Sequence, residues 1–140
     1  AESQKETHVS KHRLDSRFSS NAESIALSAM YAANHLDSVK AIVTLTESGS
    51  TAKLMSRISS GLPIYSLSRH PSTLGQTALY RGVYPVFFDS TKCEDESMVR
   101  DALNTLVEQG SLVAGDTVIL THGDAMETIG ATNTMKIVTV

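Results

Sequence analysis

The chain has 140 residues, a formal net charge of −3 and a hydrophobic content of 41%, which is typical of one globular domain. This weakly acidic balance gives no electrostatic reason to expect binding to nucleic acid or to an anionic membrane surface. Cys93 is the single cysteine, so an internal disulfide is excluded and a cytoplasmic location is expected. No apolar run reaches the roughly 20 residues that a membrane-spanning helix needs.

The N-terminal part of the chain predicts an arm followed by a helix and a strand. Residues 1–19 are polar and lack a hydrophobic period, so we expect a linker or arm before a folded domain at 20–140. Ser20 and Glu23 have the spacing of a capping box, which predicts the start of a helix. The apolar stripe of this helix is Ile25, Ala26, Ala29, Met30, Ala33 and Leu36. Residues 40–45 form an apolar run without polar alternation, which is typical of a strand buried on both faces.

Helical and extended patterns alternate through the rest of the chain. After the turn at 46–51, a helix that carries Leu54, Met55 and Ile58 is expected to stop at Gly61. The later elements are expected in this order: a strand at 64–68, a helix from 70, a strand at 83–88, a helix at 94–109, and strands at 117–121 and 135–140.

This order predicts the fold class. Strands that alternate with helices indicate an α/β fold in three layers, with a five-stranded, mostly parallel sheet and helices on both faces. The last two strands are joined by a segment without a helical pattern, so we expect the final strand to lie antiparallel at an edge. Ligands of such sheets bind outside the carboxyl ends of the strands, and the loops there are therefore the candidate sites.

The loop after the first strand, residues 46–51, is rich in groups that bind anions. It offers four hydroxyls, a glycine that lets the backbone approach a ligand closely, and the N-terminus of a helix. The predicted phosphate ligands are Thr46, Ser48, Gly49, Ser50 and Thr51. The alternative is that these hydroxyls only cap the helix, and the residues alone leave both readings open. The loop lacks the Gly-Lys-Ser/Thr ending of a P-loop.

The segment after the fourth strand is the second candidate, because long ordered loops in compact domains are often binding elements. Its candidate residues are His122, Gly123, Asp124, Met126, Glu127, Thr128 and Gly130. An ordinary connection between two strands is the alternative. His122 and Asp124 are too few ligands for a metal site, so no metal is expected. Arg69, after the second strand, either neutralises a phosphate or is simply solvated. No spacing fixes a nucleophile and its base, so no catalytic residue is predicted.

Five segments in register resemble the C-terminal domain of bacterial pyruvate kinases. They are residues 39–49, 68–71 (SRHP), 79–86 (LYRGVYPV), 115–116 and 130–135 (GATNTM). The resemblance runs in order across roughly residues 10–140. It implies a glycolytic parent enzyme that transfers a phosphoryl group from phosphoenolpyruvate to ADP in a (β/α)8 barrel, with magnesium and often potassium. The barrel, its catalytic lysine and its metal ligands have no counterpart here, so this segment alone is expected to be inactive and to need no cofactor.

The resemblance also implies regulation and assembly. The family's C-terminal domain contacts its own barrel, binds an allosteric effector and forms one subunit interface of a tetramer. Its effector phosphate loop falls on residues 46–51 and its second effector loop on residues 122–132. A pure oligomerisation module and a stand-alone phosphosugar-binding domain are the alternatives.

The departures from the family pattern narrow the expected effector. Relatives that respond to fructose 1,6-bisphosphate tend to carry an arginine before the fourth strand and a tryptophan upstream. Here residues 107–111 read VEQGS and the chain has no tryptophan. A second phosphate would also meet Asp124 and Glu127 and find no bidentate partner. We therefore expect a monophosphate effector: a hexose or pentose monophosphate, or AMP.

Overall fold

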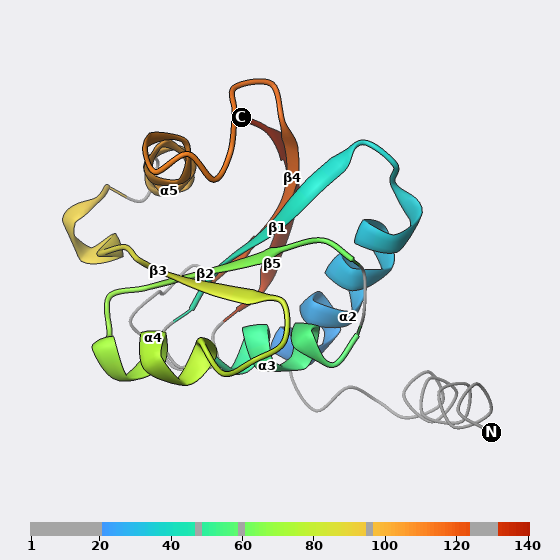
Figure 1. Cartoon of the computed structure of the whole chain (residues 1–140), viewed down its shortest axis with the longest axis horizontal. Helices are drawn as coiled ribbons and strands as arrows, with labels where there is room; N and C mark the ends of the chain where they lie inside the picture. Colours follow the sequence, from blue (N-terminus) through green and yellow to red (C-terminus); the bar gives the residue numbers. More distant parts are fainter. Residues whose placement is uncertain (1–20, 47–48, 59–60, 95–96, 124–131) are drawn as a thin grey trace.

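Five strands form one mixed sheet in the order β3-β2-β1-β4-β5 (Figure 1). The computed structural model describes residues 21–46, 49–58, 61–94, 97–123 and 132–140. The strands are β1 (Val39–Leu45), β2 (Ile64–Ser68), β3 (Val83–Phe87), β4 (Thr117–His122) and β5 (Thr134–Thr139). The first four are parallel to one another, and β5 pairs antiparallel with β4. The predicted α/β class and the antiparallel edge strand are confirmed.

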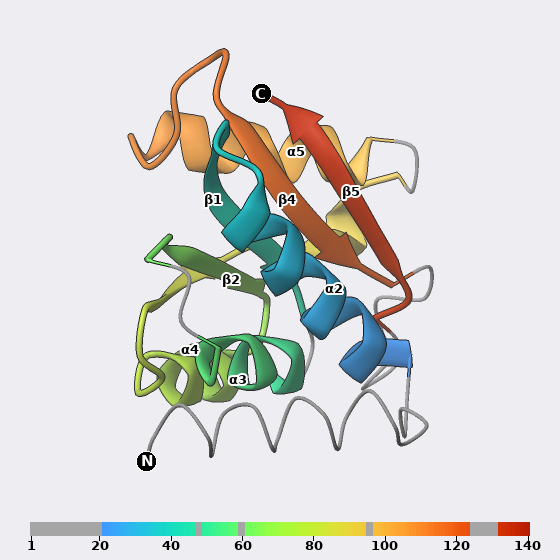
Figure 2. The ribbon, with the colours of Figure 1, turned by 90° about the vertical axis from the view of Figure 1, so that its right-hand side faces the viewer.

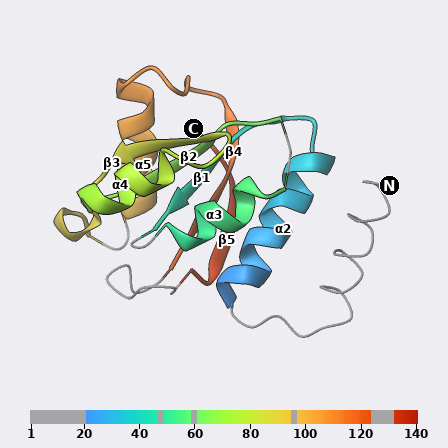
Figure 3. The same cartoon turned by 60° about the horizontal axis from the view of Figure 1, so that its bottom comes forward.

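Helices cover both faces of this sheet, as Figures 1 and 3 show. They are α2 (Asn21–His35), α3 (Ser50–Ser56), α4 (Pro71–Thr77), a short 3₁₀ helix η1 (Ser90–Lys92) and α5 (Met98–Glu108). The chain steps from β1 to β2 to β3 in one direction and returns to β4 on the other side of β1. Right-handed crossovers therefore place α3 and α4 on one face and α5 on the other. None of the described helices is long and apolar enough to cross a membrane.

The central strand β1 contributes side chains to two cores. Val43 and Leu45 pack in the core beneath α5, whereas Ile42 packs against α2 and α3 on the opposite face. Every residue of β1 except Lys40 is buried. The apolar run at residues 40–45 was predicted to be a strand buried on both faces, and this prediction is confirmed, because β1 is a parallel strand that is covered on both sides.

The predicted stripe of the first helix was wrong at its last residue. The helix ends at His35, whose ring Nδ1 lies 2.7 Å from the carbonyl oxygen of Tyr31, so the side chain occupies an acceptor of the last turn. Leu36 lies just outside the helix and is 39% exposed. Ala22, which the prediction left out, is buried with Ala26, Ala29, Met30 and Ala33, whereas Ile25 is only half-buried.

Two predicted helix boundaries were also wrong. The helix α3 ends at Ser56 rather than at Gly61, and Ile58 lies in a tight turn whose amide donates to the carbonyl of Met55 at 3.0 Å. The helix α5 begins at Met98, four residues later than expected. The chain before it first forms η1, which Asp89 caps by accepting from the amide of Thr91 at 3.0 Å.

Three hydroxyl side chains lie side by side across the middle of the sheet. Ser66, Thr44 and Thr121 occupy matching positions on β2, β1 and β4, two residues beyond the side chains that pack against α2 and α3. Each residue is 0% exposed, and no hydroxyl of the three has a hydrogen-bond partner within the described part of the chain. A buried hydroxyl without a partner costs about 1–3 kcal/mol of stability.

We predict that Thr44→Val stabilises the chain. Valine keeps the shape of threonine and removes the unpartnered hydroxyl, so the free energy of unfolding should rise by about 1 kcal/mol and the melting temperature by about 3–5 °C. Thr77→Val is the control, because Thr77 is equally buried and its hydroxyl donates to the carbonyl of Thr73 at 2.9 Å. This control should lose stability. A fall in melting temperature for Thr44→Val would mean that its hydroxyl has a partner.

Candidate functional site

The loops after β1 and β4 leave the sheet side by side. Thr44 on β1 is in register with Thr121 on β4, and both strands run in the same direction, so the two loops begin next to each other. The crossovers that leave this point go to opposite sides of the sheet, which makes it the topological switch point where open α/β sheets bind ligands. Both loops predicted from the sequence therefore start at the expected place.

The first loop is folded into a turn by its own threonine. The amide of Gly49 donates to the hydroxyl oxygen of Thr46 at 2.9 Å. Gly49 is the N-cap of α3 and has a left-handed backbone with φ of 81°. The first intrahelical bond runs from the amide of Lys53 to the carbonyl of Gly49 at 3.0 Å. The amides of residues 50–52 come before that bond, so the helix itself provides them with no acceptor.

Gly49 packs closely against α4. A Cβ atom at this position would lie 2.7 Å from the Cγ2 atom of Thr77 and 3.4 Å from the Cγ2 atom of Thr73. The first distance is shorter than carbon atoms tolerate, and the positive φ already disfavours any other residue. Glycine is therefore required here by two independent constraints, and α4 determines where the first loop lies.

A hydrogen bond joins the start of α3 to the end of the second loop. The hydroxyl oxygens of Thr51 and Thr132 lie 3.1 Å apart, across 81 positions of sequence. Both side chains are buried. The amide of Asn133 donates to the carbonyl of His122 at 3.1 Å, so the two ends of the second loop are also joined to each other.

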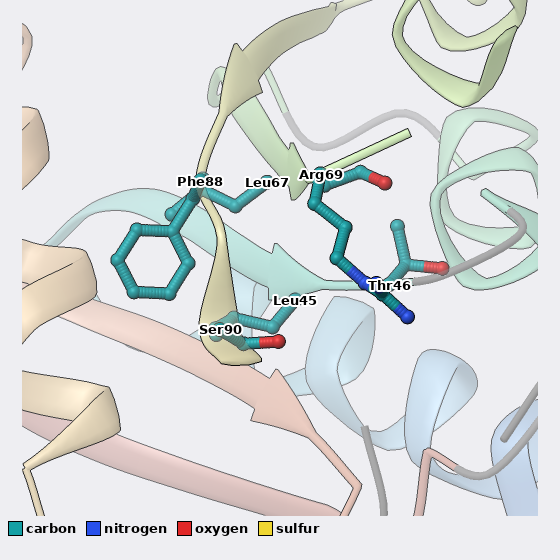
Figure 4. Close-up of a pocket in the computed structure, with 7 residues that line it drawn as sticks. Leu45, Thr46, Leu67, Arg69, Phe88 and Ser90 are labelled. Atoms are coloured by element: carbon teal, nitrogen blue, oxygen red, sulfur yellow. The ribbon is translucent and has the colours of Figure 1, made fainter. Parts of the chain in front are cut away.

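Arg69 lies at the rim of a shallow depression at the carboxyl ends of β1 and β2, where Figure 4 shows its guanidinium beside Thr46. The depression is lined by Leu45, Thr46, Leu67, Ser68, Arg69, Phe88 and Ser90. The pKa of Asp89 is lowered chiefly by the hydrogen bond from the Thr91 hydroxyl, and the positive charges of Lys92 and Arg69 lower it further.

The predicted site residues have different surroundings. Thr46, Gly49 and Thr51 are buried at the first loop, whereas Ser50 is exposed. His122 is the last residue of β4 and only 8% exposed, with Gly123 buried beside it. The other predicted residues, Ser48, Asp124, Met126, Glu127, Thr128 and Gly130, lie outside the described residues.

The sequence analysis placed Thr132 in the second effector loop, but it did not identify Thr132 as the partner of Thr51, and it missed Thr77. No local signal could have identified the pairing, because Thr51 and Thr132 are 81 positions apart. The absence of a Cβ atom at Gly49 indicated a close approach, but it did not show which residue approaches. Within the described part of the chain, no three histidine, cysteine, aspartate or glutamate side chains gather where they could hold a metal ion.

Cys93 has the surroundings of a poor nucleophile. Its burial raises the pKa of the thiol, and the hydrogen bond to Asp101 and the negative charges of Asp101 and Asp89 raise it further. The thiol is therefore protonated at neutral pH, whereas the thiolate is the reactive form.

We predict that Gly49→Ala destabilises the chain by about 2–4 kcal/mol. The left-handed backbone accounts for about 1–2 kcal/mol and the contact with Thr77 for the rest. Chemical denaturation of the two proteins measures this difference.

Gly61→Ala is the matched control for this substitution. Gly61 has a similar φ of 76°, but nothing lies within 4 Å of a Cβ atom there, so only the backbone cost should appear. Adding Thr77→Ser to Gly49→Ala removes the methyl group in contact and should restore part of the loss. Equal losses for the two glycine variants would contradict the close approach to α4.

Comparison with known proteins identifies the family to which the chain belongs. The family model described as the pyruvate kinase alpha/beta domain matches residues 23–138. Pyruvate kinase II of Salmonella typhimurium is 59% identical over 133 residues, which are 95% of this chain and 28% of that protein. The pyruvate kinase of Buchnera aphidicola subsp. Baizongia pistaciae is 51% identical over 140 residues, which are 100% of this chain and 29% of that protein.

More distant relatives match as well. The pyruvate kinase of Hypocrea jecorina is 33% identical over 128 residues, which are 85% of this chain and 23% of that protein. The chain thus spans less than a third of the length of these curated relatives. Because the family model covers most of the chain and the described fold has the expected topology, the chain belongs to the pyruvate kinase family, as its C-terminal α/β domain.

Proposed function

We propose that this chain is the regulatory domain of a cytoplasmic pyruvate kinase, that it binds a phosphorylated effector at residues 46–51, and that it takes part in subunit assembly. The single observation that carries the proposal is the match of residues 23–138 to the pyruvate kinase alpha/beta domain. The transfer of a phosphoryl group from phosphoenolpyruvate to ADP in glycolysis belongs, in this proposal, to a barrel outside these residues.

Within the described part of the chain, no three histidine, cysteine, aspartate or glutamate side chains gather where they could hold a magnesium ion, which binds carboxylates and phosphate oxygens. In this proposal, magnesium and potassium belong to the barrel of the parent enzyme, and no catalytic step is assigned to this domain.

The chemistry of the first loop supports phosphate as the group that is bound. Amides at the start of α3 and the hydroxyl of exposed Ser50 are neutral donors that suit an anion. Arg69 lines the same depression as Thr46 and adds a positive charge. Neutral donors and one cation favour a single phosphate that binds and dissociates. These features support a hexose or pentose monophosphate or AMP over a bisphosphate.

The edge strand β5 supports a part in assembly. It is the last strand of the sheet and pairs only with β4 within the described residues, so its outer edge presents backbone groups to another chain. Figure 2 shows β5 along this open side of the sheet. Ile137 is 51% exposed there. An edge of this kind suits pairing with a second copy of the chain.

A thermal titration tests effector binding. Glucose 6-phosphate, ribose 5-phosphate, AMP and fructose 1,6-bisphosphate are each added to the 140-residue chain. A ligand at about 100 times its Kd stabilises the native state by about 2.7 kcal/mol, which corresponds to a rise in melting temperature on the order of 10 °C. We expect this rise with a monophosphate.

Ser50→Asp should abolish that rise. An acidic residue is stabilising in the first turn of a helix, so the variant should fold, but its carboxylate repels a phosphate. Asn104→Asp makes the same change of charge on the exposed side of α5 and should leave the rise intact. If none of the four compounds raises the melting temperature of the unmodified chain, the domain is an assembly module and the effector proposal fails.

Self-association tests the second part of the proposal. Ile137→Lys places a charge on the outer strand, a device that prevents edge pairing in natural sheets. We expect it to raise the dissociation constant of a dimer about tenfold or more, a loss of at least about 1.4 kcal/mol, by analytical ultracentrifugation. Val113→Lys is the control, because Val113 is 67% exposed and lies outside β5. Equal dissociation constants for Ile137→Lys and the unmodified chain would contradict pairing through β5.

A further inference from the structure

The helix α4 differs from α2, α3 and α5 in what it buries. Its buried side chains are Thr73 and Thr77 alone. Leu74, its one large apolar residue, is half-buried and belongs to neither hydrophobic core. By contrast, α2, α3 and α5 each place buried methionine and alanine side chains in a core. Packing of an apolar face provides most of the stability of a helix in a protein, so α4 receives less stabilisation than the other three.

The sequence of α4 is also unfavourable for a helix. Its seven residues read PSTLGQT, and only Leu74 and Gln76 are strong helix formers. Gly75 lies in the middle of the helix at an exposed position, where glycine loses more backbone freedom than alanine would. The hydroxyl of Thr77 donates back to the carbonyl of Thr73 at 2.9 Å, and such a bond slightly destabilises a helix. A helix this short is marginal without strong packing.

We propose that α4 is a lid that opens independently of the rest of the domain, and that it can close only because residue 49 lacks a side chain. The helix contacts β2 and β3, at the edge of the sheet opposite β5, and it covers one face there (Figure 3). Opening uncovers this face and removes a neighbour of the first loop. The inference does not depend on effector binding.

The chain on either side of α4 is fixed to the sheet, so the helix can open between two anchored ends. Before the helix, the amide of His70 donates to the hydroxyl of Ser68, the last residue of β2, at 3.1 Å. After the helix, the amide of Val83 donates to the carbonyl of Tyr80 at 3.2 Å. Val83 begins β3 and is buried in a core. Both strands therefore keep their places when α4 unfolds.

The closed lid and the first loop meet at Gly49. A Cβ atom at this position would lie 2.7 Å from the Cγ2 atom of Thr77 and 3.4 Å from that of Thr73. These two threonines are the buried face of α4, so the surface with which the lid closes is the surface that a side chain at residue 49 would strike. The closed state requires glycine there, whereas the open state tolerates a methyl group.

Native-state hydrogen exchange of the 140-residue chain tests the proposal, because it measures the opening of each segment separately. Individual amides are followed by NMR under conditions in which exchange reports the opening equilibrium. The amides of Leu74 and Ala78, which donate to the carbonyls of His70 and Leu74, report on the lid. The amides of β1 and β4 report on the core. We expect the lid amides to exchange at least about tenfold faster than the slowest core amides.

Two substitutions that raise helix propensity separate lid opening from global unfolding. Asn104→Ala, at an exposed position of α5, should slow the core amides about threefold. It should leave the lid amides unchanged, because α5 stays folded when the lid opens. Gly75→Ala should slow both sets about fivefold, because α4 is unfolded both in the open state and in the unfolded chain.

Gly49→Ala tests whether closing depends on residue 49. The added methyl group meets Thr77 only while the lid is closed, so the lid amides should exchange about tenfold faster. Adding Thr77→Ser removes the methyl group in contact and should reverse part of this increase. Gly61→Ala is the control, because Gly61 has a similar φ of 76° and nothing lies within 4 Å of a Cβ atom there. It should leave the lid amides unchanged.

Any of three results would overturn the proposal. If Asn104→Ala slows the lid amides by the same factor as the core amides, α4 opens only when the whole domain unfolds. If Gly75→Ala leaves the lid amides unchanged, they exchange without unfolding of the helix. If Gly49→Ala and Gly61→Ala have equal effects on the lid amides, closing does not depend on residue 49.

Discussion

The pairing of β1 with β4 is the constraint on which the rest of the domain depends. It makes β1 the central strand, buried on both faces. The chain adds β2 and β3 on one side of β1 and then returns to add β4 on the other side, so the order of the strands reverses at this pair. The register of Thr44 with Thr121 brings the loops after the two strands together. Without this register, Thr51 and Thr132 could not form a hydrogen bond across 81 positions of sequence. The candidate site is thus a consequence of strand order, and its loops supply only the chemistry.

The buried polar side chains around this site are almost all hydroxyl groups. Apart from His122, the polar side chains that are buried within the described residues are all threonine or serine. Hydroxyls donate and accept, carry no charge and rotate to suit a neighbour, so they are buried at lower cost than carboxylates or ammonium groups. Some have fixed partners, such as the hydroxyl of Thr77 on the carbonyl of Thr73, whereas Thr44 and Thr121 have none within the described part of the chain. A core of this kind can change hydrogen-bond partners without burying or exposing a charge.

The sequence predicted what depends on local pattern. The apolar run at 40–45 identified the doubly covered strand, and the absence of a helical pattern before the last strand identified the antiparallel edge. Local pattern failed at the helix ends: α5 begins only at Met98, after a turn in which the amide of Ser97 donates to the carbonyl of Glu94, and α3 ends early in a tight turn. At the site, Gly49 was predictable as a special residue, but its contact with Thr77 and the pairing of Thr51 with Thr132 were not, because both partners are distant in sequence.

Two features of different kinds hold the first loop: the close approach of α4 at Gly49 and the hydrogen bond between Thr51 and Thr132. A Cβ atom at Gly49 would lie 2.7 Å from the Cγ2 atom of Thr77, so α4 limits which residue the loop can carry at this position. The bond between Thr51 and Thr132 is attractive and directional, so it resists separation in either direction. Since β5 begins two residues after Thr132, this bond joins the start of α3 to the edge of the sheet.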